Sequence, residues 1–539
     1  MKYKKAQKLI CLVLCAAAVL SLFAGCNLLR KDEEPAEDKP ENSPGTHITG
    51  GNYTPEKIGD SVFTLNFDPA INFTPITGTN ANNMLAAGLM FEPLFAVSSS
   101  FEAIPVLCTD YTTEDGKTWD FKILEGITFH DGAPLTSADV AFTYTFAKRV
   151  GKYTERLDCI TSVTTPDTST VRMVLSKPNY DFPLLLDVPI IKGGTIDDSV
   201  PPGTGPYSYN PISDTRATLT AYTGYRNYEN LSLKTVMLKK IEPTDINRSF
   251  ASSELDLICY DPSAENSSTI QADHELVYYP TTVFDYIGFN NDSISGSNKD
   301  IRFALSYAID REAIVDTYFS EAAVPAYSVF SPDFKYYTGD MDENGRYSVE
   351  TMSSVLRTMG ADDVDGDSYL EYPYNEFGYA ELTIKFIVNE ESDARVNAAQ
   401  HIAYALRNIG INITLEVLPW NEYIAALEDG SFDMYYGEVK LQNDFDLSEL
   451  LLPGGALNYG DIPGSQYTEL MDAYLAAEGD ARKEAASSLA TKISLDAYIL
   501  PILYKENVVA VHRNCVKGID ANQSSLFYNF SDWTIDLEK

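Results

Sequence analysis

The chain has 539 residues, of which 44% are hydrophobic and 12% aromatic, so it can fill the two or three hydrophobic cores that its length predicts. It carries 78 acidic and 40 basic residues, a formal net charge of -38 at pH 7. This balance excludes a basic surface for nucleic acid or anionic lipid, because both require clustered lysine and arginine.

The first 25 residues have the pattern of a lipoprotein signal peptide. Lysines precede an apolar run from Leu9 to Phe23, and the small residues Ala24-Gly25 lead directly into Cys26. Small residues before a cut site predict cleavage, and a cysteine immediately after it predicts lipidation. The run is shorter than the roughly 20 residues that span a bilayer. We therefore expect residues 1–25 to be removed and acyl chains on Cys26 to anchor the protein outside the cell membrane; secretion without lipid is the alternative.

Residues 26–59 have the composition of a flexible tether. They are rich in Pro, Glu, Asp, Ser and Gly and poor in large apolar side chains. Such a segment cannot bury enough surface to offset its ordering entropy, and at this length it reaches roughly 30 Å. The folded body is expected to begin near residue 60.

Strand and helix patterns follow the tether. Val62–Phe67 has the pattern of a strand, and the asparagine-rich stretch Thr77–Asn83 leads into a helical pattern that runs to Phe95. Beyond it, the alternation in Trp119–Ile123 predicts a strand, followed by a turn at residues 130–132. A helix capped near Thr136 or Ser137 completes an α+β unit.

The most regular pattern lies between Glu381 and Lys440. It predicts, in order, a strand at 382–389, a helix at 393–408 closed by Gly410, a strand at 413–418, a helix at 420–428 and a strand in which Phe432, Met434 and Tyr436 alternate. Strands separated by helices of this length form βαβ crossovers and a mainly parallel sheet. Ligands of such sheets bind beyond the carboxyl ends of the strands, which places the region after Tyr436 at a cleft.

Patterns of catalysis or metal binding are missing from the sequence. No HExxH, GxSxG, SxxK or phosphate-loop motif is present, and no two histidines have ligand spacing. The histidines after the signal are His47, His130, His274, His401 and His512. The acidic stretch 361–372 fits a calcium loop at Asp363 and Asp365, but not at its first and twelfth positions, so we interpret it as a hairpin. We expect no catalytic residues, no cofactor and no metal, and leave open a weak cation site at Asp363 and Asp365.

Four cysteines lie in the expected folded body, far apart in sequence: Cys108, Cys159, Cys259 and Cys515. No CxxC spacing occurs among them, which argues against a zinc site. Free thiols and long-range disulfides both remain compatible with this spacing.

Several segments together resemble the family 5 extracellular solute-binding proteins, which serve oligopeptide, dipeptide and nickel ABC importers. In the family's order, the matching segments are MFEPLF (Met90–Phe95), EDGKTWDFKILEGITFHDGAPLTSADVAFTYTFAK (Glu114–Lys148), GTGPYSY (Gly203–Tyr209), YIGFNN with DIRFALSYAIDREAIV (Tyr286–Val315), the DVDGD hairpin and DAYILPILYKENVVAV (Asp496–Val511). The resemblance implies an α/β protein with the two-lobed periplasmic-binding-protein type II fold, a hinge, mixed β-sheets flanked by helices, and an added α+β subdomain. Lobe I would comprise residues 60–290 and 502–539, with the subdomain at about 76–204, and lobe II residues 291–501. The hinge would lie near Asn290 and Pro501.

The resemblance also implies ligand-binding residues. Trp420, in VLPWNEY, matches a cleft tryptophan that precedes a GxFD turn. An aspartate that pairs with a peptide's amino terminus follows in the family, and Asp444 in Asn443-Asp444-Phe445 is the nearest match. It lies two residues later than expected, so an insertion is required, and Asp446 or Gln442 is the alternative.

Four further residues are also considered for the site. Tyr436 stands where some peptide-binding members carry a basic residue near the ligand's carboxylate, which puts tight binding of free short peptides in question. The side chains of Asn80, Asn82 and Asn83 are candidates for the cleft.

By this resemblance the chain is the binding component of an ABC importer. It would capture an extracellular solute, an oligopeptide first of all, by lobe closure and deliver it to a permease and ATPase complex. The resemblance further implies a monomer, anchored to the membrane through Cys26 and without a nucleic-acid partner. A nickel chelate or oligosaccharide as ligand, or a sensor role, are alternatives on the same fold. A secreted hydrolase is the alternative of another class.

Overall fold

The computed structural model describes residues 46–47, 62–260, 270–375, 378–522 and 524–537. All of them belong to one compact unit, Pro44–Lys539. The predicted signal peptide, Cys26 and most of the predicted tether lie outside the described residues. Within the predicted tether, strand β1 (Thr46–His47) pairs with Val277 and Leu276. No helix among the described residues is long and apolar enough to cross a membrane.

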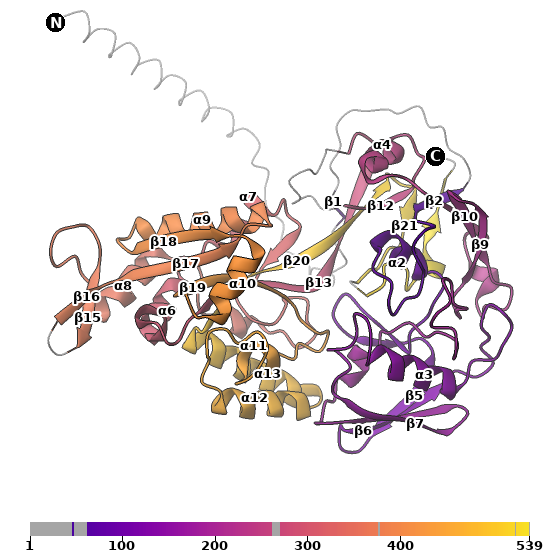
Figure 1. Ribbon diagram of the computed structural model, residues 1–539, viewed down its shortest axis with the longest axis horizontal. Helices are drawn as coiled ribbons and strands as arrows, with labels where there is room; N and C mark the ends of the chain where they lie inside the picture. The colour runs from indigo at the N-terminus through magenta and orange to yellow at the C-terminus, as the bar shows by residue number, and fades with distance from the viewer. Residues whose placement is uncertain (1–45, 48–61, 261–269, 376–377, 523, 538–539) are drawn as a thin grey trace, which may run out of the picture. The chain divides into compact units, whose positions relative to one another are not determined.

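The largest sheet has eight strands and contains the two longest strands of the described chain (Figure 1). Its order is β12 (Leu257–Tyr260), β20 (Ile499–His512), β13 (His274–Phe289), β19 (Met434–Lys440), β17 (Thr383–Asn389) and β18 (Asn412–Leu418). Two short strands join it, β1 on β13 and β14 (Ala323–Pro325) on β20.

The predicted alternation of strands and helices between Glu381 and Lys440 is confirmed. Strand β17 pairs in parallel with both β18 and β19. The connections are α9 (Asp393–Arg407) and α10 (Trp420–Glu428). Helix α9 begins where the Ser392 hydroxyl accepts a hydrogen bond from the Arg395 amide, and it buries a stripe of small and branched residues against β17.

Further helices and a hairpin complete the part of the chain between β13 and β20. They are α5 (Ile294–Ser297), α6 (Lys299–Ser306), α7 (Arg311–Tyr318), α8 (Val349–Thr358), the hairpin of β15 (Glu371–Asn375) and β16 (Gly378–Glu381), α11 (Ser448–Leu451), α12 (Ser465–Ala476) and α13 (Gly479–Asp496). Side-chain caps mark several starts: Ser348 caps α8, and Asp310 caps α7. Helix α13 ends at Ala497, whose φ of 53° is left-handed.

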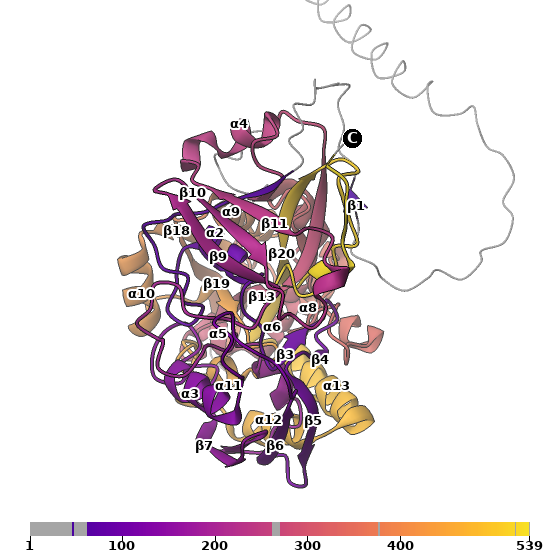
Figure 2. The same ribbon diagram turned by 90° about the vertical axis from the view of Figure 1, so that its right-hand side faces the viewer.

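A four-stranded sheet packs with the C-terminal segment of the described chain in one hydrophobic core. Its order is β2 (Phe63–Asn66), β11 (Thr235–Lys239), β10 (Arg216–Ala221) and β9 (Tyr207–Ser213). Figure 2 shows β9, β10 and β11 side by side. Helix α2 (Ala81–Ala87) contacts β2, helix α4 (Ile246–Ala251) contacts β12, and the pair β21 (Val516–Lys517) and β22 (Thr534–Ile535) belongs to the same hydrophobic core as this sheet.

The predicted α+β unit forms a second four-stranded sheet, which we call the subdomain sheet. Its order is β5 (Cys108–Thr113), β6 (Thr118–Ile123), β8 (Thr170–Leu175) and β7 (Ile160–Asp167). Trp119, Phe121 and Ile123 all point into the core, as their alternation predicts. Helix α3 (Ser137–Ala147) begins with a capping box between Thr136 and Asp139. A short antiparallel pair, β3 (Phe95–Val97) and β4 (Ala103–Pro105), leads into this unit.

The expected helix up to Phe95 is shorter than its pattern indicates. Helix α2 ends at Ala87, and Phe95 begins β3. Pro93 disfavours the helical conformation of the residue before it. In addition, the Met90 carbonyl accepts a hydrogen bond from the Gly205 amide, where a Cβ would clash with Met90, so a tertiary contact replaces the helical one.

Strands β13 and β20 connect separate hydrophobic cores. One core combines residues from β2 to β11 with Val277, Val509 and the C-terminal segment. A second lies around β17, β18 and α9 and includes Ile287, Phe289 and Leu500. The register of β13 on β20 shifts between Pro280 and Phe284 and again between Asp285 and Tyr286. These irregular positions lie where the two strands pass from one core to the next.

Candidate ligand-binding site

Trp420 is the predicted site residue with the most accessible surface. It is the first residue of α10, after Pro419, and its side chain is 50% exposed. Its ring lies 6.1 Å from that of Tyr423, whose hydroxyl donates a hydrogen bond to the Tyr436 carbonyl at 2.7 Å. Trp420 thus packs beside Tyr423, which is bound to the first half of β19, and keeps an exposed face for contact with a solute.

Tyr436 lies inside the large sheet. Its side chain is 2% exposed, and its hydroxyl donates to Asp285 Oδ2 at 3.0 Å. Burial, followed by the charge of Asp285, raises its pKa, so the hydroxyl stays protonated and remains a donor. Its present role is to satisfy a buried carboxylate on β13.

Gln442, Asn443 and Asp444 are brought together at a contact between β19 and the subdomain. Gln442 Oε1 accepts from Arg156 Nε at 3.1 Å. Asn443 Nδ2 donates to the Leu184 carbonyl at 3.1 Å, and Asp444 Oδ2 accepts from Asn179 Nδ2 at 2.7 Å. Asn443 Nδ2 also donates to Asp187 Oδ2 at 3.3 Å, so these partners lie between residues 156 and 187 of the chain.

Asp444 belongs to a group of charged and polar side chains that we call the Arg482 cluster (Arg482, Asp181, Asn179, Asp444 and Lys335). Arg482 Nε lies 2.9 Å from Asp181 Oδ2, and Lys335 Nζ lies 2.9 Å from Asp181 Oδ1. Arg482 and Asp444 are 0% and 1% exposed. Burial and the neighbouring Asp446 raise the pKa of Asp444 to about 6, against the opposing effects of Arg482 and Asn179.

Two strained phenylalanines fix the backbone of this contact. Phe445 and Phe101 have φ values of 54° and 57°, in the left-handed region that bulky residues rarely adopt. Their rings meet edge to face at 5.1 Å, and both side chains are buried. The strain is sustained by packing on both sides, which holds Asp444 in place.

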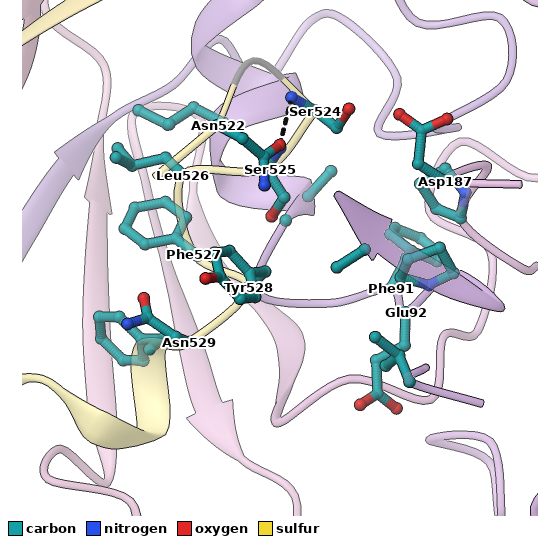
Figure 3. Close-up of a pocket in the computed structure, with 18 of the residues that line it drawn as sticks. Phe91, Glu92, Asp187, Asn522, Ser524, Ser525, Leu526, Phe527, Tyr528 and Asn529 are labelled. Carbon is teal, nitrogen blue, oxygen red and sulfur yellow. Dashed lines mark hydrogen bonds between the residues drawn. The ribbon is translucent and has the colours of Figure 1, made fainter. Parts of the chain in front are cut away.

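A cavity of about 550 Å³ lies next to this contact. Its volume is within the range of ligand pockets, roughly 300–1,000 Å³. In Figure 3, Asn522 and the residues from Ser524 to Asn529 face Phe91, Glu92 and Asp187 across the space. The wall combines aromatic rings with side-chain amides, including Tyr153, Tyr225, Tyr279, Phe527, Tyr528, Asn227, Asn507, Asn522 and Asn529. The cavity thus offers apolar area together with hydrogen-bonding groups.

Most charges at the cavity are paired. Arg226 lies 2.7 Å from Glu92, whose pKa is raised by burial and lowered in turn by Arg226. Asp187 forms an ion pair with Arg156 and accepts a hydrogen bond from Asn443. Lys152 also lines the cavity, with its ammonium 5.3 Å from the Tyr153 ring centroid.

A third group of charges, which we call the hinge cluster (Asp285, Arg395, Glu438 and Lys505), joins β13, β19, β20 and α9. Glu438 lies 2.9 Å from Arg395 and 2.5 Å from Lys505. Burial raises the pKa of Asp285 to about 7, although Lys505 lowers it. Within the part of the chain that the structure describes, Asp285 Oδ1 is buried without a hydrogen-bond partner.

Asp363 and Asp365 lie on the predicted acidic hairpin and come together with Glu371. Ligand atoms of the three side chains lie within 4.8 Å of one another. Asp363 also accepts from the Gly366 and Ser368 amides, and Glu371 from the Val364 amide, so the carboxylates stabilise the turn. The sequence comparison with a calcium loop missed Glu371 because it tested Tyr372 at the last position.

The four cysteines of the folded body are free thiols. Sequence reasoning missed Arg156, Asp187 and Asn179, because their partners lie more than two hundred and fifty residues away in the chain. Arg482 could have been found, since it is a charged residue on the buried stripe of α13 with Ala486, Leu489 and Ile493.

Comparisons with known proteins agree with this architecture. Residues 102–448 match the family profile of the bacterial extracellular solute-binding proteins, family 5. A putative ABC transporter peptide-binding protein of Brucella ovis is 26% identical over 450 residues, covering 77% of this chain and 81% of that protein. The oligopeptide-binding protein AppA of Bacillus subtilis is 23% identical over 561 residues, covering 98% and 99%.

Solved structures show the same fold. The unliganded open form of MppA, a periplasmic murein tripeptide binding protein, superposes with a TM-score of 0.76 at 17% identity, covering 88% of this chain and 98% of that one. AppA of Bacillus subtilis in complex with a nonapeptide gives 0.60 at 20% identity, covering 89% and 99%. The predicted α/β fold of the periplasmic-binding-protein type II is confirmed.

Proposed function

The chain belongs to the bacterial extracellular solute-binding proteins of family 5, and on this premise we propose that it captures oligopeptides and delivers them to an ABC permease and ATPase complex. The observation that carries the proposal is the cavity of about 550 Å³ beside the long strands β13 and β20. Aromatic walls accept varied side chains, and the asparagine amides suit the donors and acceptors of a peptide backbone. The relatives named for peptide binding, in Brucella ovis and Bacillus subtilis, support the same ligand class.

Capture would proceed by closure of the lobes about β13 and β20. A solute stabilises a closed form only by the additional affinity that it has for that form, so it must contact residues on both sides of the cleft. We propose Trp420 and Gln442 as contacts on one side and the cavity lining on the other. Asn443, Asp444 and Tyr436 retain their proposed site roles, with the condition that a solute must displace the protein partners they now have.

Location and anchoring follow from the amino-terminal pattern. The family is extracytoplasmic, and we propose that the protein is a monomer held at the cell membrane by acyl chains on Cys26 after removal of residues 1–25. In cells fed a labelled fatty acid, the wild-type protein is expected to carry the label and Cys26→Ser to be unlabelled. Label on Cys26→Ser would contradict the proposal.

Ligand class is tested by the thermal stability of the mature protein without its signal peptide. A pool of pentapeptides built from uncharged residues should raise Tm, since a ligand at a hundred times its Kd stabilises the folded state by about 2.7 kcal/mol. Nickel(II)-histidine and a cello-oligosaccharide serve as comparison ligands. A shift with either of these and none with the peptide pool would overturn the peptide assignment.

A binding component releases its solute unchanged. Peptides recovered after prolonged incubation with the protein should therefore have their original masses. Hydrolysis products that appear with the wild-type protein would instead support the secreted-hydrolase alternative.

A further inference from the structure

We propose that His130 is a positioning residue for the wall of the cavity. Its neutral ring holds the segment Gly203–Gly205 against Met90, and peptide affinity falls when the ring takes up a second proton. His130 lies in the predicted turn at residues 130–132, between β6 and α3, and the glycine segment directly precedes β9. The inference rests on the proposed function and concerns the response of the same site to acid.

Both ring nitrogens of His130 contact the main chain, and the two contacts are of opposite kinds. Nδ1 lies 3.3 Å from the Gly203 amide, which can only donate, and Nε2 lies 3.0 Å from the Gly205 carbonyl, which can only accept. A neutral ring with its proton on Nε2 is the form that satisfies both contacts. The main chain adds a third bond, in which the His130 amide donates to the Gly203 carbonyl at 2.9 Å.

The glycine segment lies directly behind the wall of the cavity. The Gly205 amide donates to the Met90 carbonyl at 2.9 Å. A Cβ at position 203 would lie 2.0 Å from the Met90 carbonyl oxygen and 2.8 Å from the Phe91 ring, so only glycine permits this approach. Phe91 and Pro206 both line the cavity, and Figure 3 shows Phe91 on the wall opposite the C-terminal segment. A shift of the glycine segment would therefore move the wall.

A second proton on the ring would change the contact with Gly203 from attraction to repulsion. Nδ1 would then carry a hydrogen that faces the N–H of Gly203, so the glycine segment would have to move away. Burial lowers the pKa of His130, against the hydrogen bond to Gly205 and the negative charge of Asp131. The ring is therefore neutral at pH 7 and gains its second proton in acid.

The charged and titratable groups around the ring are bound to other partners. Asp131 forms an ion pair with Lys192, which lowers the pKa of Asp131, so this carboxylate stays charged while the ring titrates. Tyr222 packs edge to face at 5.3 Å, and its hydroxyl donates to a main-chain carbonyl at 2.8 Å. Beyond the glycine segment, Glu92 is paired with Arg226, and burial raises the pKa of Glu92. Because Glu92 can also gain a proton, the test compares variants at each pH.

The test measures the affinity of uncharged pentapeptides with free termini, the free pentapeptide pool, by calorimetry from about pH 7 to about pH 5. The proteins are the wild type, H130Q and H401Q. Glutamine can still donate to Gly205, but it does not titrate. From neutral to acid pH, the wild type should lose at least about threefold more affinity than H130Q, since one proton is coupled to binding. Near pH 6, comparison of two buffers with different ionisation enthalpies should show that peptide binding releases protons from the wild type and fewer from H130Q.

The matched control is H401Q, which makes the same substitution on α9. His401 Nδ1 lies 3.3 Å from the Tyr318 hydroxyl, and His401 does not line the cavity. H401Q should keep the wild-type pH profile and proton release. A folded H130Q with the wild-type profile, or binding by the wild type without proton release, would overturn the inference and leave peptide binding intact. Failure of the wild type to bind the pool at neutral pH would overturn the proposed function as well.

Discussion

The Arg482 cluster and the cavity lining around Lys152 are regions of opposite character. In the cluster, Arg482, Asp181, Asn179 and Asp444 are buried and hold one another through ion pairs and hydrogen bonds. At the cavity, Lys152 is exposed, and its ammonium lies 5.3 Å from the Tyr153 ring centroid with no carboxylate within ion-pair distance among the described residues. Paired buried charges stabilise a contact between parts of the chain, whereas unpaired charges beside a cavity are available to a solute. A solute can therefore reach the charge at the cavity directly, whereas it must first displace protein partners to reach Asp444 in the cluster.

The largest effect is expected from breaking the paired region. Arg482→Met removes the buried cation that lies 2.9 Å from Asp181, and it leaves the carbonyls of Leu475 and Asp444 without the Arg482 donors. Removing one partner of a buried charge pair costs about 3–5 kcal/mol, so Tm and the urea midpoint should fall clearly. K177Q, which removes a lysine from a surface ion pair with Asp472, is the control and should change both by little. An unchanged urea midpoint in Arg482→Met would show that the cluster does not stabilise the fold.

A smaller effect, on affinity alone, is expected at the cavity. Ser525 lies on the C-terminal segment, its hydroxyl close to Gly88 across the cavity wall. Ser525→Trp places an indole in the space and should weaken binding of the free pentapeptide pool by at least about 2 kcal/mol, roughly thirtyfold, by calorimetry. Ser531→Trp, at another position of the lining, is the size-matched comparison and should weaken binding less. Full affinity in Ser525→Trp would place the ligand elsewhere.

The hinge cluster is intermediate between the paired charges of the Arg482 cluster and the unpaired charge at the cavity. Its Asp285 is buried, but among the described residues only one of its two carboxylate oxygens has a hydrogen-bond partner. Its pKa of about 7 lies above the value of roughly 3.9 expected in the unfolded chain. Between these two pH values the folded state holds a proton that the unfolded state has lost, so stability falls as pH rises from about 4 to 7. Asp285→Asn should remove this contribution, and its Tm relative to wild type should rise between pH 4 and pH 8.

Burial raises the pKa of Glu506 to about 7 as well, so Glu506 also makes the folded state less stable as pH rises from about 4 to 7. The difference between wild type and Asp285→Asn therefore reports Asp285, whereas the wild-type profile alone reports both groups. A difference in Tm that stays constant across this pH range would contradict the assignment to Asp285.

Local patterns predict the fold well where neighbouring elements in sequence are also neighbours in space. Strands β17, β18 and β19 and helices α9 and α10 lie within one continuous stretch, and their periodicity suffices to define them. The end of α2 could not be predicted in this way, because Gly205 competes for the Met90 carbonyl from a distant part of the chain. Strand β1 likewise arises from a tertiary pairing within a segment whose composition favours disorder.

For each contact at the candidate site, only one of the two partners was predictable from the sequence. Trp420 and the segment Gln442–Asp444 stand out in the sequence, but their partners do not. Arg156 and Gln442 are separated by 286 residues, and Asn179 and Asp444 by 265. No periodicity links residues so far apart, so the compensation of Asp444 by protein groups emerges only from the folded chain.

Direct competition between solute classes provides the most direct test of peptide capture. The mature protein is incubated with equal amounts of the uncharged pentapeptide pool, nickel(II)-histidine and a cello-oligosaccharide, and its complexes are weighed by native mass spectrometry. The expected spectrum contains a single added mass per protein, within the range of the pentapeptides and absent in Ser525→Trp. A mass increase that corresponds to the nickel complex or the oligosaccharide, with no peptide bound, would contradict the proposed function.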